Sequence, residues 1–200
     1  SWQGGLGLPD REYYSLADAK SKEIQNKYVL HIQKMLQLGG VPNAPDLAQK
    51  IMVLETTLAA QHMKKEQTRD IVKLYNKHAV KDLNQLMPDF NWSAMLKNAE
   101  IINQKNLIVA QVDYLKSLNT IIKTTPLNTW KAYLKWNVIH GSAQSLNVAL
   151  DSENFDFYGK TLNGIPVQQP LWRRGVNRVN NSLGEIVGKV YVKKHFSPEA

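Results

Sequence analysis

Three side chains that could bind a metal are spaced four residues apart: His62, Glu66 and Asp70. If one helix continued through all three, they would form a stripe on one face. Lys64 and Lys65 lie beside that stripe, however, and two acids four residues apart are common in helices. A stripe of mixed charge is more typical of a solvated, ion-paired surface. We therefore interpret this segment as surface and predict no metal site there.

A helical zinc site of the HExxH type needs two histidines one turn apart, with a glutamate between them that acts as base. The chain has five histidines, and no two of them lie within one turn of each other: His31, His62, His78, His140 and His195. The sequence therefore predicts neither metal ligands nor catalytic residues in this chain.

Other catalytic chemistry finds little support. The chain has no cysteine, which excludes disulfides, thiol catalysis and cysteine zinc sites. No Gly-x-Ser-x-Gly elbow is present. The run Gly4–Gly7 lacks the Lys-Ser/Thr of a phosphate loop, so its glycines are better explained by turns or close chain approach. The net charge is +8, but the lysines are scattered singly along helical patterns. We expect no nucleic-acid partner.

Arginine binds carboxylates with two parallel hydrogen bonds, so Arg11, Arg173 and Arg174 could hold a substrate carboxylate. A salt bridge or a helix-end contact is the simpler expectation for all three. Arg11 directly follows Asp10, which favours a local ion pair or a capping arrangement.

Helical periodicity dominates the pattern of apolar residues. Gly39 and Gly40 predict the end of one helix, and Asn43–Asp46 the start of the next. Further helices are predicted over 80–87, 112–123, from about 126, and over 170–194. The predicted apolar faces are Ile24, Tyr28, Ile32 and Met35; Leu47, Ile51, Leu54 and Leu58; Trp130, Leu134 and Val138; and Val176, Val179, Leu183, Ile186 and Val190.

Residues 106–109 form the only convincing strand candidate. The sequence therefore predicts a mainly α fold, a multi-helix lobe with at most one short strand, spanning residues 1–200 as one unit. Gly184 and Gly188 lie one turn apart in the last helix, where each costs about 1 kcal/mol relative to alanine. Close approach of another backbone would offset that cost. The five tryptophans are expected to anchor the core or a domain seam: Trp2, Trp92, Trp130, Trp136 and Trp172.

Several segments, in order along nearly the whole chain, resemble the N-terminal helical region of the neprilysin and endothelin-converting-enzyme family of zinc metallopeptidases. The bacterial oligopeptidase branch is the most similar. The segments are 5–14, Arg69-Asp70 with 75–77, 86–92, 130–136, 155–160, 172–174 and 184–192. Their motif residues include Gly7, Pro9, Arg11, Tyr14, Trp92, Trp172, Gly184 and Gly188. Each segment alone is modest, and their order and spacing make the resemblance specific.

The resemblance implies that this chain is a helical substrate-gating lobe, a fragment of a larger peptidase whose catalytic zinc lobe lies beyond it. The family's HExxH and ExxxD ligands would belong to that lobe, together with Zn²⁺. Glu66 and Asp70 spell ExxxD, but their stretch matches a different family segment. The helical lobe would enclose the active-site chamber and restrict cleavage to short peptides. The absence of cysteine favours a bacterial protein of the periplasm, the cell envelope or the medium.

The partners implied by the resemblance are the C-terminal catalytic lobe and short peptide substrates. The seam that normally meets the catalytic lobe would be exposed here and could drive dimerisation. The alternative is a stand-alone helical module that binds proteins or peptides without catalysis. A reading frame that continues past residue 200 into HExxH supports the first interpretation, and a stop codon supports the second.

We predict that the 200-residue chain alone neither binds zinc stoichiometrically nor cleaves peptides, because no metal-ligand pattern occurs in it. Calorimetric zinc titration and a fluorogenic peptide assay check this. Peptidase activity in the purified chain would contradict the interpretation.

Overall fold

A computed structural model describes residues 3–101 and 103–197. The α-helices are α1 (Glu12–Ser15), α2 (Ala19–Leu38), α3 (Ala44–Gln61), α4 (Ile71–Leu74), α5 (Leu83–Leu86), α6 (Trp92–Asn98), α7 (Val112–Thr124), α8 (Leu127–Ser142), α9 (Val148–Asn154) and α10 (Leu171–His195). Short 3₁₀ turns are η1 (Gln67–Arg69), η2 (Val80–Asp82) and η3 (Ala143–Ser145), and η4 (Phe155–Leu162) is a π-helix. The strands are β1 (Lys77–Ala79) and β2 (Asn106–Ile108).

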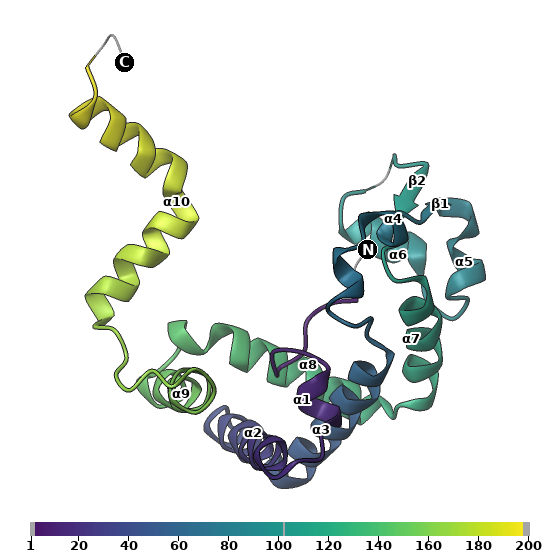
Figure 1. Ribbon diagram of the computed structural model, residues 1–200, viewed down its shortest axis with the longest axis horizontal. Coiled ribbons are helices and arrows are strands. Elements are labelled where there is room, and N and C mark those ends of the chain that lie inside the picture. Colours follow the sequence, from purple (N-terminus) through teal and green to yellow (C-terminus); the bar gives the residue numbers. More distant parts are fainter. Residues whose placement is uncertain (1–2, 102, 198–200) are drawn as a thin grey trace.

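The chain forms an open U (Figure 1). Helices α2, α3, α8 and α9 make its base. One arm carries α4 to α7 and the two strands, and the other arm is α10 alone. The mainly helical fold predicted from the sequence is confirmed.

The ends of α2 and α3 follow from local chemistry. The Asp18 carboxylate accepts a hydrogen bond from the Ser21 amide at 3.0 Å and caps the first turn of α2. Gly40 adopts a left-handed conformation with φ of 70° directly after the helix, as expected for a glycine stop. Asn43 is also left-handed, and Pro45 lies in the first turn of α3. The predicted stop and start are both present.

The main core fills the base of the U. Trp136 of α8 is 1% exposed and meets the edge of Tyr28 at a centroid distance of 6.1 Å. Ile32, Met35 and Ile51 are fully buried beside them. A second, smaller core lies in the arm around Leu83, Met87, Trp92, Val109 and Leu115. The two cores give the base and this arm separate hydrophobic support.

The predicted strand is present as β2, and it pairs antiparallel with β1, which the sequence analysis did not identify. Lys77 lies opposite Ile108, and Ala79 opposite Asn106. A strand must satisfy its backbone hydrogen bonds with a partner. The partner is only three residues long, Lys77, His78 and Ala79, so it carries no periodic signal of its own.

The predicted apolar face of α8 is wrong in part. Leu134 and Val138 are 61% and 68% exposed, whereas Ala132 and Trp136 are 3% and 1% exposed. The helix packs on α2 and α3 through the face of Ala132 and Trp136. The predicted helix over 80–87 is split into η2 and α5, and it ends before Pro88.

Helix α10 differs most from expectation. Its predicted stripe is exposed rather than buried, with Ile186 and Val190 at 60% and 63%. Leu183 leaves helical geometry at φ −126° and ψ 24°. Cβ atoms added at Gly184 and Gly188 would meet no described atom within 4 Å. The close approach expected at these glycines is therefore not made by any described residue.

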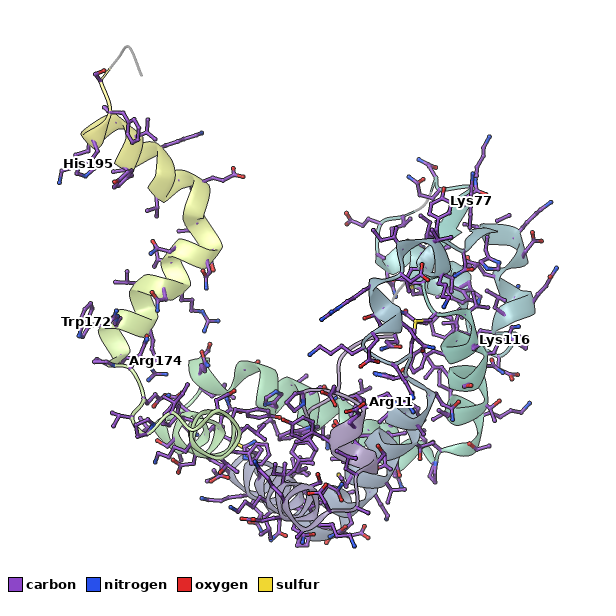
Figure 2. All side chains as sticks on the ribbon, in the orientation of Figure 1. Arg11, Lys77, Lys116, Trp172, Arg174 and His195 are labelled. Carbon is purple, nitrogen blue, oxygen red and sulfur yellow. The ribbon has the colours of Figure 1, made fainter. Side chains whose placement is uncertain are left out.

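The tryptophans divide between core and surface. Trp92 and Trp136 are buried, and Trp130 is half-buried. Trp172 is 70% exposed and points away from the opposite arm (Figure 2). Trp2 lies outside the described residues.

None of the helices in the described ranges is long and apolar enough to cross a membrane.

Helix α10 is attached through its first turns. Arg174 makes two parallel contacts with Asp151 of α9, at 2.9 and 2.8 Å, and Gln168 donates to the same carboxylate. We refer to these contacts of Asp151 as the latch.

Asp151→Asn is expected to remove the charge of this latch and to lower amide-exchange protection in residues 171–178 by tenfold or more. The exposed pair Asp156–Lys160 offers the control Asp156→Asn, which should leave that exchange unchanged. Equal exchange in both variants would contradict the latch.

Candidate functional site

The N-terminal segment and α2 meet α3 around one buried carboxylate, that of Glu55 in α3. Tyr14 and Tyr28 both donate hydrogen bonds to Glu55 Oε2, at 2.7 and 2.8 Å. The Leu8 amide in turn donates to the Tyr14 hydroxyl at 2.9 Å. The N-terminal segment, α2 and α3 are thus joined by three consecutive hydrogen bonds.

Gly7 brings the π-helix η4 into the same network. Tyr158 of η4 donates to the Gly7 carbonyl at 2.9 Å. A Cβ at Gly7 would lie 1.6 Å from the Tyr28 hydroxyl and 3.2 Å from Glu55 Oε2. Only glycine fits here, because the backbone passes directly over the tyrosine–carboxylate contact. We refer to Gly7, Tyr14, Tyr28, Glu55 and Tyr158 as the Glu55 cluster.

The Glu55 cluster has a structural role. Glu55 is 1% exposed, and burial raises the pKa of its carboxyl above the usual range, although the hydrogen bonds from Tyr14 and Tyr28 oppose that shift. Burial and the nearby carboxylate raise the pKa of Tyr14 and Tyr28 far above that of free tyrosine. These phenols remain protonated donors in the physiological range. A carboxylate sealed from water cannot reach a substrate, so its role is to hold chain segments together.

A second polar cluster lies beside it, between α2, α8, α9 and η4. His31 Nδ1 lies 3.0 Å from Glu153 Oε1, and the Lys34 ammonium contacts the other carboxylate oxygen. The His31 ring stacks on Phe157 with a centroid distance of 4.7 Å. Burial lowers the pKa of His31, although the Glu153 contact opposes this. The pKa of the Glu153 carboxyl is lowered: burial, the largest cause, raises it, but the His31 and Lys34 contacts outweigh burial.

His140 of α8 extends this second cluster. Its Nδ1 lies 3.0 Å from Asn154 Oδ1, and its ring stacks on Trp136 at 5.1 Å and tilts against Tyr158 at 4.7 Å. Burial lowers the pKa of His140 as well. The two imidazoles thus pack as aromatic rings in the base of the U, where burial favours their neutral forms.

The π-helix η4 positions the rings that join the two clusters. Phe157 and Tyr158 are consecutive, yet both contact His31, one stacked and one edge-on at 5.4 Å. A Cβ at Gly159 would lie 2.3 Å from the Phe155 ring. π-Helical turns are rare and often mark functional positions. Here the wider turn brings two neighbouring aromatic rings into one core.

Arg11 makes a helix-end contact, one of the two roles expected for it, and not the local ion pair with Asp10. It donates to the backbone carbonyl of His62, at the end of α3, and Asp10 accepts from the Glu12 amide at 2.9 Å instead. Pro9 is exposed beside them. Arg11 therefore holds the N-terminal segment against α3. Trp92 lies in the arm, where its ring nitrogen donates to the Met87 carbonyl at 3.3 Å.

The stripe of His62, Glu66 and Asp70 does not exist. Helix α3 ends at Gln61, and irregular chain and η1 follow it. Across residues 3–101 and 103–197, no three histidine or acidic side chains are arranged to hold a metal ion. The residues present therefore do not fit a zinc site.

Glu55, His31 and Glu153 were not predicted from the sequence as functional positions. Glu55 follows Ile51 by four residues, so it falls on the predicted apolar face of α3. His31 follows Tyr28 by three residues, on the apolar face of α2. A lone polar residue on a buried helix face is the signal that could have found both, because such a residue must have a partner in the core.

The geometry defines a helical lobe whose polar groups serve its own packing. Comparison with known proteins identifies its family. The sequence matches Peptidase family M13 over residues 1–200, and the chain belongs to this family. The resemblance to neprilysin and endothelin-converting enzymes is thereby confirmed.

Curated relatives support the assignment. Endothelin-converting enzyme-like 1 of Mus musculus is 27% identical over 200 residues, which cover 98% of this chain and 26% of that protein. Endothelin-converting enzyme 1 of Homo sapiens is 27% identical over 204 residues, covering 99% and 26%. The chain thus spans about a quarter of these relatives.

Solved structures show the same arrangement. Zinc metalloprotease ZMP1 of Mycobacterium tuberculosis in its open state has a TM-score of 0.89 and 33% identity, over 98% of this chain and 31% of that chain. The same enzyme with an inhibitor gives 0.87 and 32%, over 98% and 30%. PEPO from Lactobacillus rhamnosis, at 0.82 and 14% identity, covers 98% and 31%, and it supports the fold alone.

Gly7→Ala is expected to destabilise the chain by about 2 kcal/mol, because the Tyr28 hydroxyl must move and cannot do so without weakening its bond to Glu55. Chemical denaturation measures this. The matched control is Gly5→Ala, which meets no described atom within 4 Å and should change stability by less than about 0.5 kcal/mol. Equal stability of the two variants would contradict the packing at Gly7.

Stability is expected to fall as the pH drops from 7.5 to 5.5. The folded-state pKa values of His31 and His140 lie below those of the unfolded chain, so unfolding takes up protons as the pH falls through about 6.5. Glu55, whose folded-state pKa is raised, opposes this loss of stability. Glu153, whose folded-state pKa is lowered, contributes stability that is lost only at lower pH. The free energy of unfolding at each pH measures the effect.

His140→Gln keeps a polar contact to Asn154 but cannot titrate. The loss of stability on acidification should therefore be smaller in this variant than in the parent chain. An identical pH profile for the two proteins would show that His140 does not carry the effect.

Proposed function

We propose that the chain is a non-catalytic helical lobe of a neprilysin-like zinc metalloendopeptidase. The observation that carries this proposal is the combination of family and site. The chain belongs to Peptidase family M13, and the buried Glu55 and Glu153 carboxylates in the described part of the chain are engaged by its own side chains. Its contribution would be steric selection of peptides and not bond chemistry.

In this proposal the parent protein encloses its active site in a chamber, and this lobe forms part of the wall. The relatives named above include a zinc metalloprotease, which supports Zn²⁺ in the parent protein. The metal would be held outside residues 3–101 and 103–197, because these described residues offer no ligand cluster for it. The U-shaped outline of Figure 1 supports a role as a wall.

The catalytic lobe is the proposed partner of α10. The exposed apolar stripe of α10 includes Val176, Ile186 and Val190, at 51%, 60% and 63% exposure. Apolar surface on this scale marks an interaction site or a tendency to associate. Without the catalytic lobe, the chain would therefore form dimers through α10. The similarity to bacterial proteins supports a location in the periplasm, the cell envelope or the medium.

The experiment uses the longer protein encoded by the gene and peptides of graded length. We expect kcat/KM to fall by tenfold or more between peptides of about ten residues and chains of about fifty, and folded proteins to remain intact, because substrates must enter past the wall. Gly7→Ala should loosen the packing of the wall and so reduce the ratio of kcat/KM for short peptides to kcat/KM for long chains. Gly5→Ala should leave that ratio unchanged. Cleavage that is independent of length in the parent protein would contradict the proposal.

A further inference from the structure

A pocket of about 560 Å³ lies where α10 leaves the base of the U. It is lined by Gln144 of η3, Phe155 of η4, the connecting segment before α10, and the first three turns of α10. Its volume is in the range of about 300 to 1,000 Å³ that is typical of ligand sites. None of the buried clusters described above contributes to it.

We propose that this pocket binds the C-terminal end of a peptide, with the terminal carboxylate on Arg178. This rests on the proposed function, in which peptides reach this lobe, and it assigns a specific anchor to them.

The charge of the pocket points to an anion. Arg174 is neutralised by Asp151, which it meets through two contacts. Arg178 contacts only the Ser145 hydroxyl and has no carboxylate partner among residues 3–101 and 103–197. An arginine with free N–H groups offers a fork that matches a carboxylate.

The start of α10 adds positive potential at the same place. Pro170 precedes the helix, and no side chain caps its first turn. The free backbone N–H groups of a helix start favour negative charge nearby. Arg174 points from this turn toward α9, while Trp172 points away from the base (Figure 2).

The remaining lining matches a peptide chain. Side-chain amides both donate and accept hydrogen bonds, as peptide groups do. The side-chain amides of Gln144 and Asn181 have no hydrogen-bond partner within the described ranges, and that of Asn177 has only a 3.4 Å contact to Gln169. Phe155, Ile165 and Leu171 supply apolar surface for side chains. A free phosphate would use the charge but leave this amide and apolar lining unfilled.

The test uses the 200-residue chain and an N-acetylated apolar pentapeptide in two forms, one with a free C-terminal carboxylate and one amidated. NMR titration follows the side-chain amide signals of Gln144, Asn177 and Asn181. We expect those signals to shift with the free acid, and the Kd to rise at least tenfold on amidation.

Arg178→Ala should weaken binding of the free acid at least tenfold, and Arg178→Lys should weaken it less, because lysine keeps the charge without the fork. The control is Arg173→Ala, which changes a neighbouring exposed arginine outside the pocket lining. It should leave the Kd unchanged. Melting temperatures establish that all three variants remain folded.

Equal affinity for acid and amide, shifts confined to other residues, or no binding at millimolar peptide would overturn the assignment. Failure here is distinguishable from failure of the proposed function. If length-dependent cleavage by the parent protein persists without peptide binding at Arg178, only the pocket is refuted. If the peptide binds but the parent cleaves without regard to length, only the gating role is refuted.

Discussion

The arrangement of the base depends on one buried carboxylate. Glu55 sits in α3 with almost no solvent contact, and its Oε2 accepts hydrogen bonds from both Tyr14 and Tyr28. A carboxylate buried without such donors would be strongly destabilising, so each tyrosine must be in place for α3 to pack. Because the Tyr14 hydroxyl also accepts from the Leu8 amide, the same constraint fixes the N-terminal segment. Tyr158 then fixes η4 against Gly7.

This constraint explains why two motif segments that are far apart in the sequence occur together. The segment 5–14 supplies Gly7 and Tyr14, and the segment 155–160 supplies Tyr158. Both serve the packing of the lobe. In the proposed role as a wall, the lobe must keep a fixed shape, and buried hydrogen-bonded polar groups favour a unique arrangement over alternative packings. The same reasoning accounts for the imidazoles of His31 and His140, which are packed as rings within the core.

The sequence predicted local features well and partnerships poorly. Helix periodicity, the glycine stop at Gly39–Gly40 and the proline near the start of α3 are local signals, and each is present in the structure. The burial of Trp136 instead of Leu134 depends on which helices face α8, and β1 is too short to show a periodic pattern in the sequence. The apolar stripe of α10 indicated a buried face, but no described element covers it, because periodicity reports that a face is apolar and not what covers it. Glu55 was missed because its tyrosine partners are 41 and 27 residues away.

The most direct test of the shared carboxylate is a double-mutant cycle with Tyr14→Phe and Tyr28→Phe, followed by urea unfolding. If one carboxyl oxygen joins both segments, losing the second donor leaves the buried Glu55 side chain with neither hydroxyl, and the two losses should not add. We expect a coupling free energy of about 1 kcal/mol. Effects that add to within about 0.3 kcal/mol would mean that the two tyrosines act independently, and the account of Glu55 as the common anchor would be contradicted.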